Sequence, residues 1–146
     1  MKGRVIQVCI SPNRGVKKPV EEAKALAEMG FAGDYHAKGG VRQVSLLASE
    51  SIQVVRERGL TLDHGCFGEN IVSQGVDLKG IAVGTRIRVG EVLLEVSAVG
   101  KDCPEPCEIG RTVGECIMPS EGVFAVVCEG GFIRRGDEIM FEEEWI

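Results

Sequence analysis

Residues 85–96 read TRIRVGEVLLEV, and this stretch indicates how the chain folds. Polar and apolar residues alternate through Thr85–Val89, then Gly90 and Glu91 interrupt the run, and Val92–Val96 follows. A period of two places alternate side chains on opposite faces of a strand, and a two-residue break containing glycine is typical of a hairpin. The stretch therefore predicts two antiparallel strands with one face buried.

The rest of the chain carries similar short apolar segments separated by glycines and turns. We expect further strands at Gly3–Ile10, Val41–Ala48, Val123–Cys128 and Ile133–Glu142, the last containing a turn at residues 135–137. With 20 glycines in the chain, this pattern is typical of many short strands joined by tight turns. Because closure of a sheet removes its exposed edges, the expected fold class is mainly β, as a closed or nearly closed antiparallel β-barrel.

Two segments have helical character. Ser49–Arg58 begins with a residue that can cap a helix, places Ile52 and Val55 on one side, and is followed by a glycine. Pro19–Met29 consists largely of good helix formers, which favours a second helix, but its position between strands leaves an extended edge as the alternative. We expect one or two short helices.

Length and charge limit the class of protein. A chain of 146 residues has the size of one domain, so we expect a single domain over residues 1–146. A net charge of -5 gives no general attraction to nucleic acid or an anionic membrane. No secretory signal or apolar run of membrane-spanning length stands out. The sequence therefore predicts a cytoplasmic protein that binds neither nucleic acid nor membrane and keeps its cysteines reduced.

The first segment with candidate chemistry is GFAGDYHAKGGVRQ, residues 30–43. Its glycine-marked turns confine Asp34, His36, Lys38 and Arg42 to a short stretch that could converge on one mouth of the barrel. Asp34 could orient the His36 imidazole, or each residue could hold the end of a strand. An aspartate after glycine is usually a turn former and an isolated histidine is usually structural, although the basic neighbours strengthen the functional interpretation.

The second segment is GCFGENI, residues 65–71, in which Glu69 and Asn70 precede an apolar strand. They could offer a carboxylate and an amide to a ligand. Equally, they could satisfy backbone groups of the loop.

The third segment is KDCPEPCEI, residues 101–109. Its two prolines predict a stiff, extended loop that displays Cys103 and Cys107 at the end of an element. A neighbouring Lys101 or Arg111 would favour the thiolate, the form that attacks sulfur or binds a soft metal. The C-x3-C spacing also fits two ligands of a structural zinc site, but no second paired motif supports zinc.

Three segments together resemble the MOSC family, named for the C-terminal part of molybdenum cofactor sulfurases. They begin with GFAGDYHAKGG at residue 30, GCFGENI at residue 65 and GECIMPSEG at residue 114, and they occur in the family's order over nearly the whole chain. The closest resemblance is to the small bacterial stand-alone members. It implies a β-barrel of the pyruvate kinase insert type.

The resemblance also implies site residues. Cys107 is the first choice for the reactive cysteine and a candidate molybdenum ligand, and Cys103 is the second choice. Residues that match positions expected around the pocket are Asp34, His36, Arg42, Glu69 and Asn70. The basic residues that we expect to hold a pterin phosphate are Lys38, Arg42, Lys101 and Arg111.

The resulting hypothesis is a MOSC protein that binds molybdenum cofactor (molybdopterin), carries sulfur as a Cys107 persulfide for the cofactor or a metal–sulfur centre, or does both. It would then be a sulfur carrier or transferase. Its expected partners are a cysteine desulfurase or proteins of cofactor synthesis and insertion. Pyridoxal phosphate is not expected, because the aminotransferase-like domain of the full-length sulfurases is missing here. The alternatives are a non-catalytic interaction module in molybdenum cofactor metabolism and a small zinc-stapled barrel.

Overall fold

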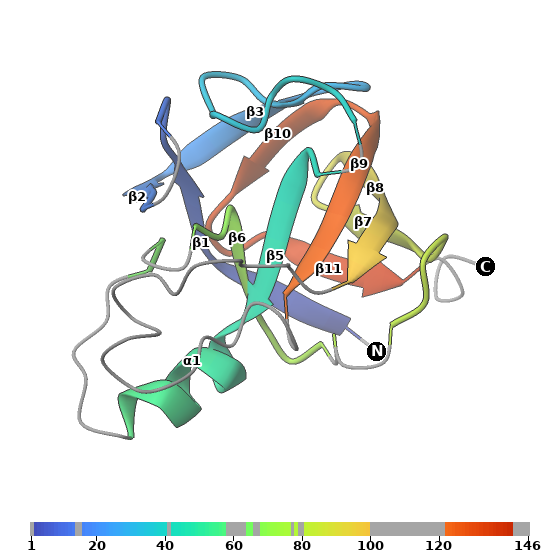
Figure 1. Cartoon of the computed structure of the whole chain (residues 1–146). Helices are drawn as coiled ribbons and strands as arrows, with labels where there is room; N and C mark the ends of the chain where they lie inside the picture. The colour runs from blue at the N-terminus through green and yellow to red at the C-terminus, as the bar shows by residue number, and fades with distance from the viewer. Residues whose placement is uncertain are drawn as a thin grey trace.

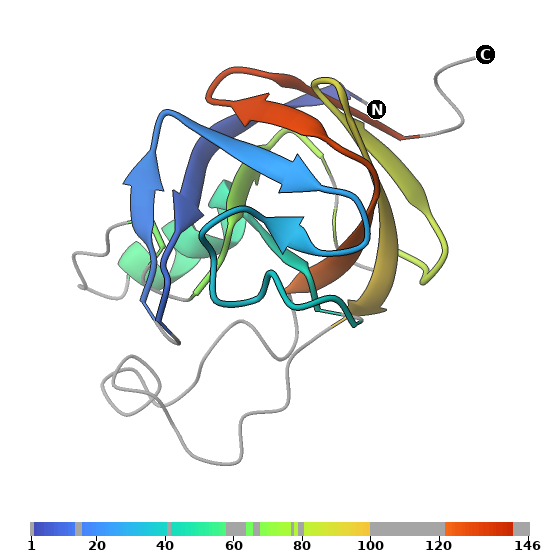
Figure 2. The same cartoon turned by 90° about the horizontal axis from the view of Figure 1, so that it is seen from above.

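A closed β-barrel forms the body of the molecule (Figures 1 and 2). The structure is a computed structural model that describes residues 2–13, 16–40, 42–57, 64–65, 68–76, 78, 81–99 and 122–141. In this part of the chain seven strands pair around the barrel, and β1 closes it by pairing with both β6 and β11. Their order is β11 (Glu138–Phe141), β7 (Arg86–Val89), β8 (Val92–Val99), β9 (Val123–Glu129), β5 (Val44–Ala48), β6 (Ile71–Gln74) and β1 (Lys2–Ile10).

The hairpin predicted from residues 85–96 is confirmed as β7 and β8. Ile87 pairs with Leu94 and Val89 with Val92, and all four side chains are buried in the core. The polar residues alternate to the other face, where Arg86 lies 3.4 Å from Glu95. The alternation of polar and apolar residues in the sequence therefore predicts which face of this hairpin is buried and which face is exposed to solvent.

A small second sheet covers one end of the barrel. It contains β10 (Gly131–Arg134), β3 (Glu22–Leu26) and β4 (Gly30–Phe31), and it crosses the top of the molecule in Figure 1. Phe31 and Ile133 are fully buried and belong to the same apolar cluster as the barrel interior. The strand β2 (Lys18–Val20) pairs with the end of β1 beside this sheet.

The expected helix at Pro19–Met29 is wrong. The segment is extended, as in the alternative, but β3 is the central strand of its sheet and only β2 lies at an edge. The segment forms β2 and β3, followed by a turn at residues 27–29. Ala23 and Ala25 are buried while Glu22 and Lys24 are exposed, which is the alternation of a strand. Pairing of β3 with β10 on one side and β4 on the other outweighs the helix propensity of these residues.

The helix predicted at Ser49–Arg58 is confirmed as α1 (Ser49–Arg56). It packs against β5 and β6, and its Ile52 is buried. The barrel is antiparallel except at this point, because α1 lies on the crossover that makes β5 and β6 a parallel pair. Leu46 faces the interior of the barrel and its neighbour Leu47 does not, yet both are fully buried. Both faces of β5 are therefore covered.

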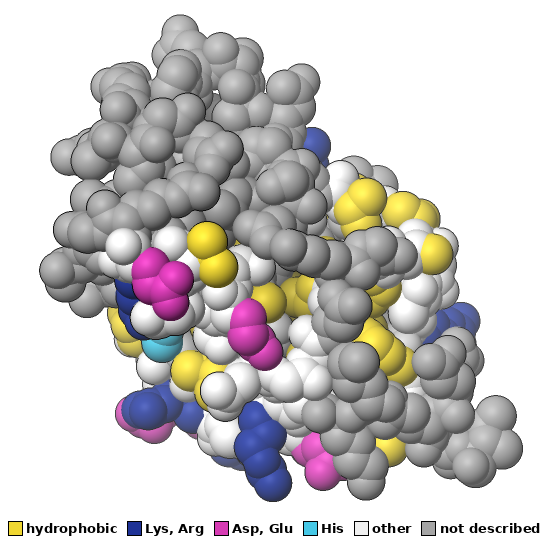
Figure 3. Space-filling model, turned by 90° about the horizontal axis from the view of Figure 1, so that it is seen from below, with side chains coloured by type: hydrophobic (Ala, Val, Ile, Leu, Met, Phe, Trp, Pro, Cys, Tyr) yellow, Lys and Arg dark blue, Asp and Glu magenta, His cyan; other side chains and the backbone are white. Residues whose placement is uncertain are grey.

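The described surface mixes charges of both signs. Figure 3 shows acidic, basic and apolar side chains interspersed on the face seen from below. Within the residues that the structure describes, no helix has the length and apolar character needed to cross a membrane.

Ser73 on β6 carries a buried hydroxyl that has no hydrogen-bond partner among the residues that the structure describes. The residue is fully buried between Val5 on β1 and Ala48 on β5. Replacing Ser73 with alanine is therefore expected to raise the free energy of unfolding by about 1 kcal/mol, measured by denaturant unfolding. Ser45→Ala is the matched control, because the equally buried Ser45 hydroxyl has partners at Gly68 and Asn70 and its loss should destabilise. A less stable Ser73→Ala protein would contradict the expectation.

Candidate functional site

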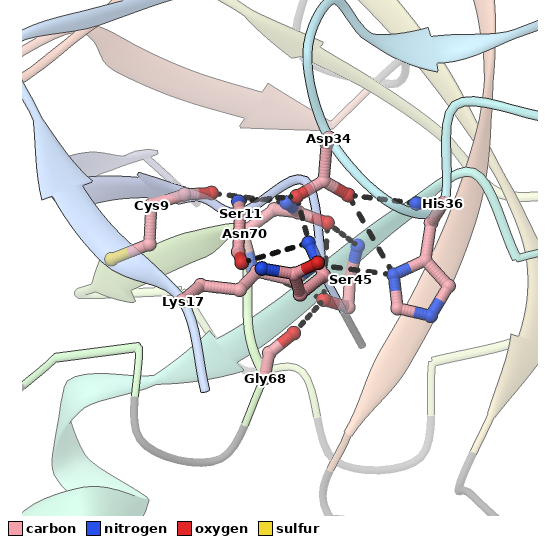
Figure 4. A network of polar contacts seen from close by, with 9 residues as sticks. Cys9, Ser11, Lys17, Asp34, His36, Ser45, Gly68 and Asn70 are labelled. Carbon is pink, nitrogen blue, oxygen red and sulfur yellow. Dashed lines mark hydrogen bonds and ion pairs between the residues drawn. The ribbon is translucent and has the colours of Figure 1, made fainter. Parts of the chain in front are cut away.

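A buried ion pair lies where β1 ends. Ser11 follows β1 directly, and Lys17 precedes β2. The loop after β4 brings Asp34 and His36 to the same place, and a backbone bond from Tyr35 N to Ser11 O ties this loop to β1. We call Ser11, Lys17, Asp34 and His36 the Asp34 cluster (Figure 4).

Asp34 is the centre of this cluster. Its Oδ1 accepts hydrogen bonds from Ser11 N at 3.0 Å and from Lys17 Nζ at 2.8 Å, and its Oδ2 accepts one from His36 N at 3.1 Å. The side chains of Asp34 and Lys17 are both fully buried. The carboxylate thereby joins three segments that are separate in the sequence.

Asp34 is ionised in the folded protein. Burial by itself would raise the pKa of this carboxyl, but contact with the His36 side chain, the hydrogen bonds from Lys17 Nζ and Ser11 N, and the charge of Lys17 outweigh burial. The pKa of Asp34 is therefore held well below its ordinary value of 3.8. The pair with Lys17 is formally neutral, which makes its burial tolerable.

His36 forms the partly exposed side of the cluster. Its Nδ1 lies 3.2 Å from Lys17 Nζ, and 29% of its side chain is exposed. Its ring lies beside that of Tyr35, with centroids 5.4 Å apart, and Lys38 Nζ lies 3.5 Å from the centre of the Tyr35 ring. An imidazole and a cation thus reach the surface from one loop.

Arg42 adds a second exposed cation close by in the sequence. Its guanidinium carbon lies 5.2 Å from the centre of the Phe124 ring. Phe124 on β9 is the register partner of Ser45 on β5, and the Ser45 hydroxyl donates a hydrogen bond to Asn70 Oδ1. Of the predicted basic residues, Lys101 and Arg111 lie outside the described residues.

Asn70 and Glu69 use their side chains to hold the backbone. Asn70 Oδ1 accepts a hydrogen bond from Ser45 N at 3.0 Å, and its Nδ2 donates to Cys9 O at 3.0 Å, so it links β5 and β1. Glu69 is fully buried, and its Oε2 accepts from Gly65 N at 2.8 Å. These contacts fit the structural interpretation of both residues, and Asn70 supports the wall beside the Asp34 cluster (Figure 4).

The predicted reactive cysteines, Cys103 and Cys107, lie outside the described residues. Of the described thiols, Cys9 is buried and Cys128 is half-buried. Burial, aided by the nearby charge of Glu95, raises the pKa of the Cys128 thiol. Within the described residues, no group of three or more His, Cys, Asp or Glu side chains is placed to hold a metal ion.

A surface cavity of about 390 Å³ lies at the opposite end of β1 from the Asp34 cluster. Its lining residues are Gly3, Arg4, Gln74, Gly75 and Glu138. None of them is a residue that the sequence predicts for the site.

Lys17 is the site residue that the sequence does not reveal. It lies in the run Val16-Lys17-Lys18, in which Val16 and Lys18 are exposed and Lys17 is fully buried. By residue type alone, the valine would be expected to be buried and the lysines exposed. The burial of Lys17 depends on Asp34, which approaches it only in the folded chain.

Solved structures share this architecture. YuaD from Bacillus subtilis aligns with a TM-score of 0.78 at 19% identity, covering 95% of this chain and 94% of that one. YiiM from Geobacillus stearothermophilus aligns with a TM-score of 0.71 at 18% identity, covering 95% and 74%. YiiM from Escherichia coli aligns with a TM-score of 0.64 at 20% identity, covering 94% and 69%. At these identities the likeness concerns the fold.

Sequence comparison is more specific about the family. No curated protein sequence gives a significant match. The family model of the MOSC domain, however, matches residues 33–140, which include the loop of Asp34 and His36 and most of the barrel. Together with the closed barrel, this match means that the chain belongs to the MOSC domain family.

Proposed function

We propose that this protein binds molybdenum cofactor at the end of β1, beside the Asp34 cluster, and that Cys107 is its reactive thiol. The observation that carries the proposal is the buried, internally neutral pair of Lys17 and Asp34. It fixes a loop whose surface groups, His36 and Lys38, are suited to an anionic ligand. Membership of the MOSC family supports the choice of cofactor.

The pterin phosphate is the part of the cofactor that Lys38 and Arg42 would hold. In a chain of net charge -5, a phosphate needs a local concentration of cations. Lys38 and Arg42 are both exposed, and each rests on an aromatic ring. Contact with an aromatic face steadies a cation without using its hydrogen-bond donors, which then remain available to phosphate oxygens.

The thiol would act in one of two ways. When bound, the cofactor supplies a molybdenum centre, for which a cysteine thiolate is a suitable soft ligand. As a sulfur carrier, the Cys107 thiolate would attack the outer sulfur of a donor persulfide, R–S–SH. A new S–S bond forms on Cys107 as the donor's S–S bond breaks, leaving a Cys107 persulfide and the donor thiolate R–S⁻. A cysteine desulfurase is the expected donor, and a protein of cofactor synthesis or insertion is the expected recipient.

The test compares Cys107→Ser with Cys103→Ser. Cys107→Ser is expected to abolish persulfide formation after incubation with a cysteine desulfurase, or to abolish cofactor retention, while leaving the thermal unfolding temperature unchanged. Cys103→Ser should have a smaller effect. Arg42→Ala should weaken cofactor retention, whereas Lys24→Ala, an exposed position on β3, should not.

Three outcomes would contradict this assignment. Full persulfide loading together with unchanged cofactor retention in Cys107→Ser would move the reactive thiol to Cys103. No cofactor and no persulfide in the wild type would favour an interaction module. Stoichiometric zinc in the purified protein, with loss of folding on chelation, would favour the zinc-stapled barrel.

Thiol labelling gives a further prediction. Cys103 and Cys107 are expected to react with iodoacetamide in the native protein before Cys128, and Cys9 is expected to react last. Cys9 is fully buried, and the raised pKa of Cys128 keeps its thiol protonated near neutral pH. Mass-spectrometric mapping of a time course gives the order. Faster labelling of Cys9 or Cys128 would remove the reason for choosing the two thiols that flank the prolines.

A further inference from the structure

The contact between Lys17 and His36 restricts where the imidazole can carry its proton. Lys17 Nζ lies 3.2 Å from His36 Nδ1. An ammonium group has three donors and no acceptor, so Nδ1 must accept in this contact. An Nδ1 that accepts a hydrogen bond carries no proton, and the proton of a neutral ring is then on Nε2.

Asp34 keeps Lys17 in the role of donor. The Asp34 carboxylate lies 2.8 Å from Lys17 Nζ, and both side chains are fully buried. A neutral Lys17 would leave a buried carboxylate without its counter-charge, which is strongly unfavourable. The buried pair therefore favours a charged lysine next to the imidazole.

The competing arrangement has poorer geometry. In it, His36 Nδ1 would donate its own proton to Asp34 Oδ2. That distance is 3.6 Å, which is too long for a hydrogen bond, and the same oxygen already accepts from His36 N at 3.1 Å. The 3.2 Å contact with Lys17 is the better hydrogen bond of the two.

We propose that Lys17 is a positioning residue that holds His36 as the Nε2–H tautomer, so that the ring presents an uncharged N–H donor to an oxygen atom of the bound ligand. Figure 4 shows the second ring nitrogen of His36 on the side facing away from Lys17 and Asp34. The ring is partly exposed, with 29% of the side chain accessible. Only the identity of the ligand, a phosphate-bearing pterin, rests on the proposed function.

Nuclear magnetic resonance tests the tautomer in the ligand-free protein. The chain has two histidines, so His64→Gln leaves only the His36 ring in long-range ¹H–¹⁵N correlation spectra. Recorded at about pH 8, above the ordinary pKa of histidine, the spectra should show an unprotonated Nδ1 and a protonated Nε2. A proton on Nδ1, in the neutral or the doubly protonated ring, would overturn the proposal.

Removing the lysine should reverse the tautomer. In Lys17→Met, Asp34 becomes the nearest charged neighbour of Nδ1, so the proton is expected to move to Nδ1 and point at the carboxylate. Retention of the Nε2–H tautomer in a folded Lys17→Met protein would show that Lys17 has only a structural role and would overturn the proposal. If that variant does not fold, Lys17→Met/Asp34→Asn removes both charges, and its ring should show a mixture of tautomers. If the His36 ring of this double variant remained entirely in the Nε2–H tautomer, the proposal would also be overturned.

Cofactor retention tests the donor separately. His36→Gln keeps an N–H group near the Nε2 position and should retain cofactor, whereas His36→Asn keeps only a group near Nδ1 and should lose about tenfold in affinity. Equal retention by the two variants would overturn the donor role. A wild type that binds no cofactor, with the expected tautomer in its spectra, would overturn the proposed function and leave the role of Lys17 intact.

Discussion

Replacing Asp34 with asparagine is expected to lower the free energy of unfolding by about 3–5 kcal/mol, because it leaves the Lys17 ammonium buried without a counter-charge. The Lys17 and Asp34 side chains are both fully buried and lie 2.8 Å apart. Asparagine keeps the shape of the carboxylate, so the loss should reflect charge rather than packing. Denaturant unfolding at pH 7 gives the measurement.

A double-mutant cycle isolates the pair. Lys17→Met alone should also destabilise strongly, because it leaves the Asp34 carboxylate buried without its counter-charge. The double variant Lys17→Met/Asp34→Asn should lose less than the sum of the two single changes, since it leaves neither charge alone. Additive losses would mean that the two residues stabilise the fold independently, against the geometry of the cluster.

The same pair gives a pH dependence of stability. Because the pKa of Asp34 is lowered on folding, the unfolded chain takes up a proton near 3.8 while the folded protein does not. The stabilisation by Asp34 is therefore fully present above about pH 5 and is lost as the pH falls through 3.8 toward the folded pKa. The difference in unfolding free energy between wild type and Asp34→Asn should be constant from pH 7 to about pH 5 and should shrink below that. A difference that grows on acidification would contradict the lowered pKa.

Replacing Gly65 with alanine is expected to cost about 3 kcal/mol or more, since the new methyl group would meet a backbone atom in a backbone conformation that alanine disfavours. Gly65 has a φ of +95°, and a Cβ built on it would clash with the backbone oxygen of Lys17. Lys17 N also donates to Gly65 O at 2.8 Å, so the two backbones are held face to face. To make room, the segment that carries the buried lysine must shift.

Gly84→Ala is the matched control for this change. Gly84 has almost the same φ, +96°, but no atom of the described part of the chain lies within 4 Å of a Cβ built there. Its replacement should cost only the backbone penalty, about 1–2 kcal/mol. The difference between the two variants, measured by thermal or denaturant unfolding, isolates the close approach to Lys17. Equal losses would contradict the contact.

The site was only partly predictable from the sequence. Glycine-marked turns and mixed charges single out residues 30–43, and the structure does bring Asp34 and His36 together there. Lys17 gives no such signal, because its neighbour Lys18 is the same residue type and is exposed. The Lys17 side chain is paired with Asp34 and its backbone lies against Gly65, and both partners are distant from it in the chain.

Elements that depend on near neighbours in the chain can be predicted from the sequence alone. The hairpin of β7 and β8 follows from a period of two and a glycine turn, and α1 follows from a serine of a type that can cap a helix and from the spacing of its apolar residues. Three features could not be predicted in this way: the helix formers of residues 22–26 become β3, β5 and β6 run parallel, and a lysine is buried in the site. Each of these depends on partners supplied by remote segments when the barrel closes. Their pairing and charge contribute more free energy than the local preferences that they override.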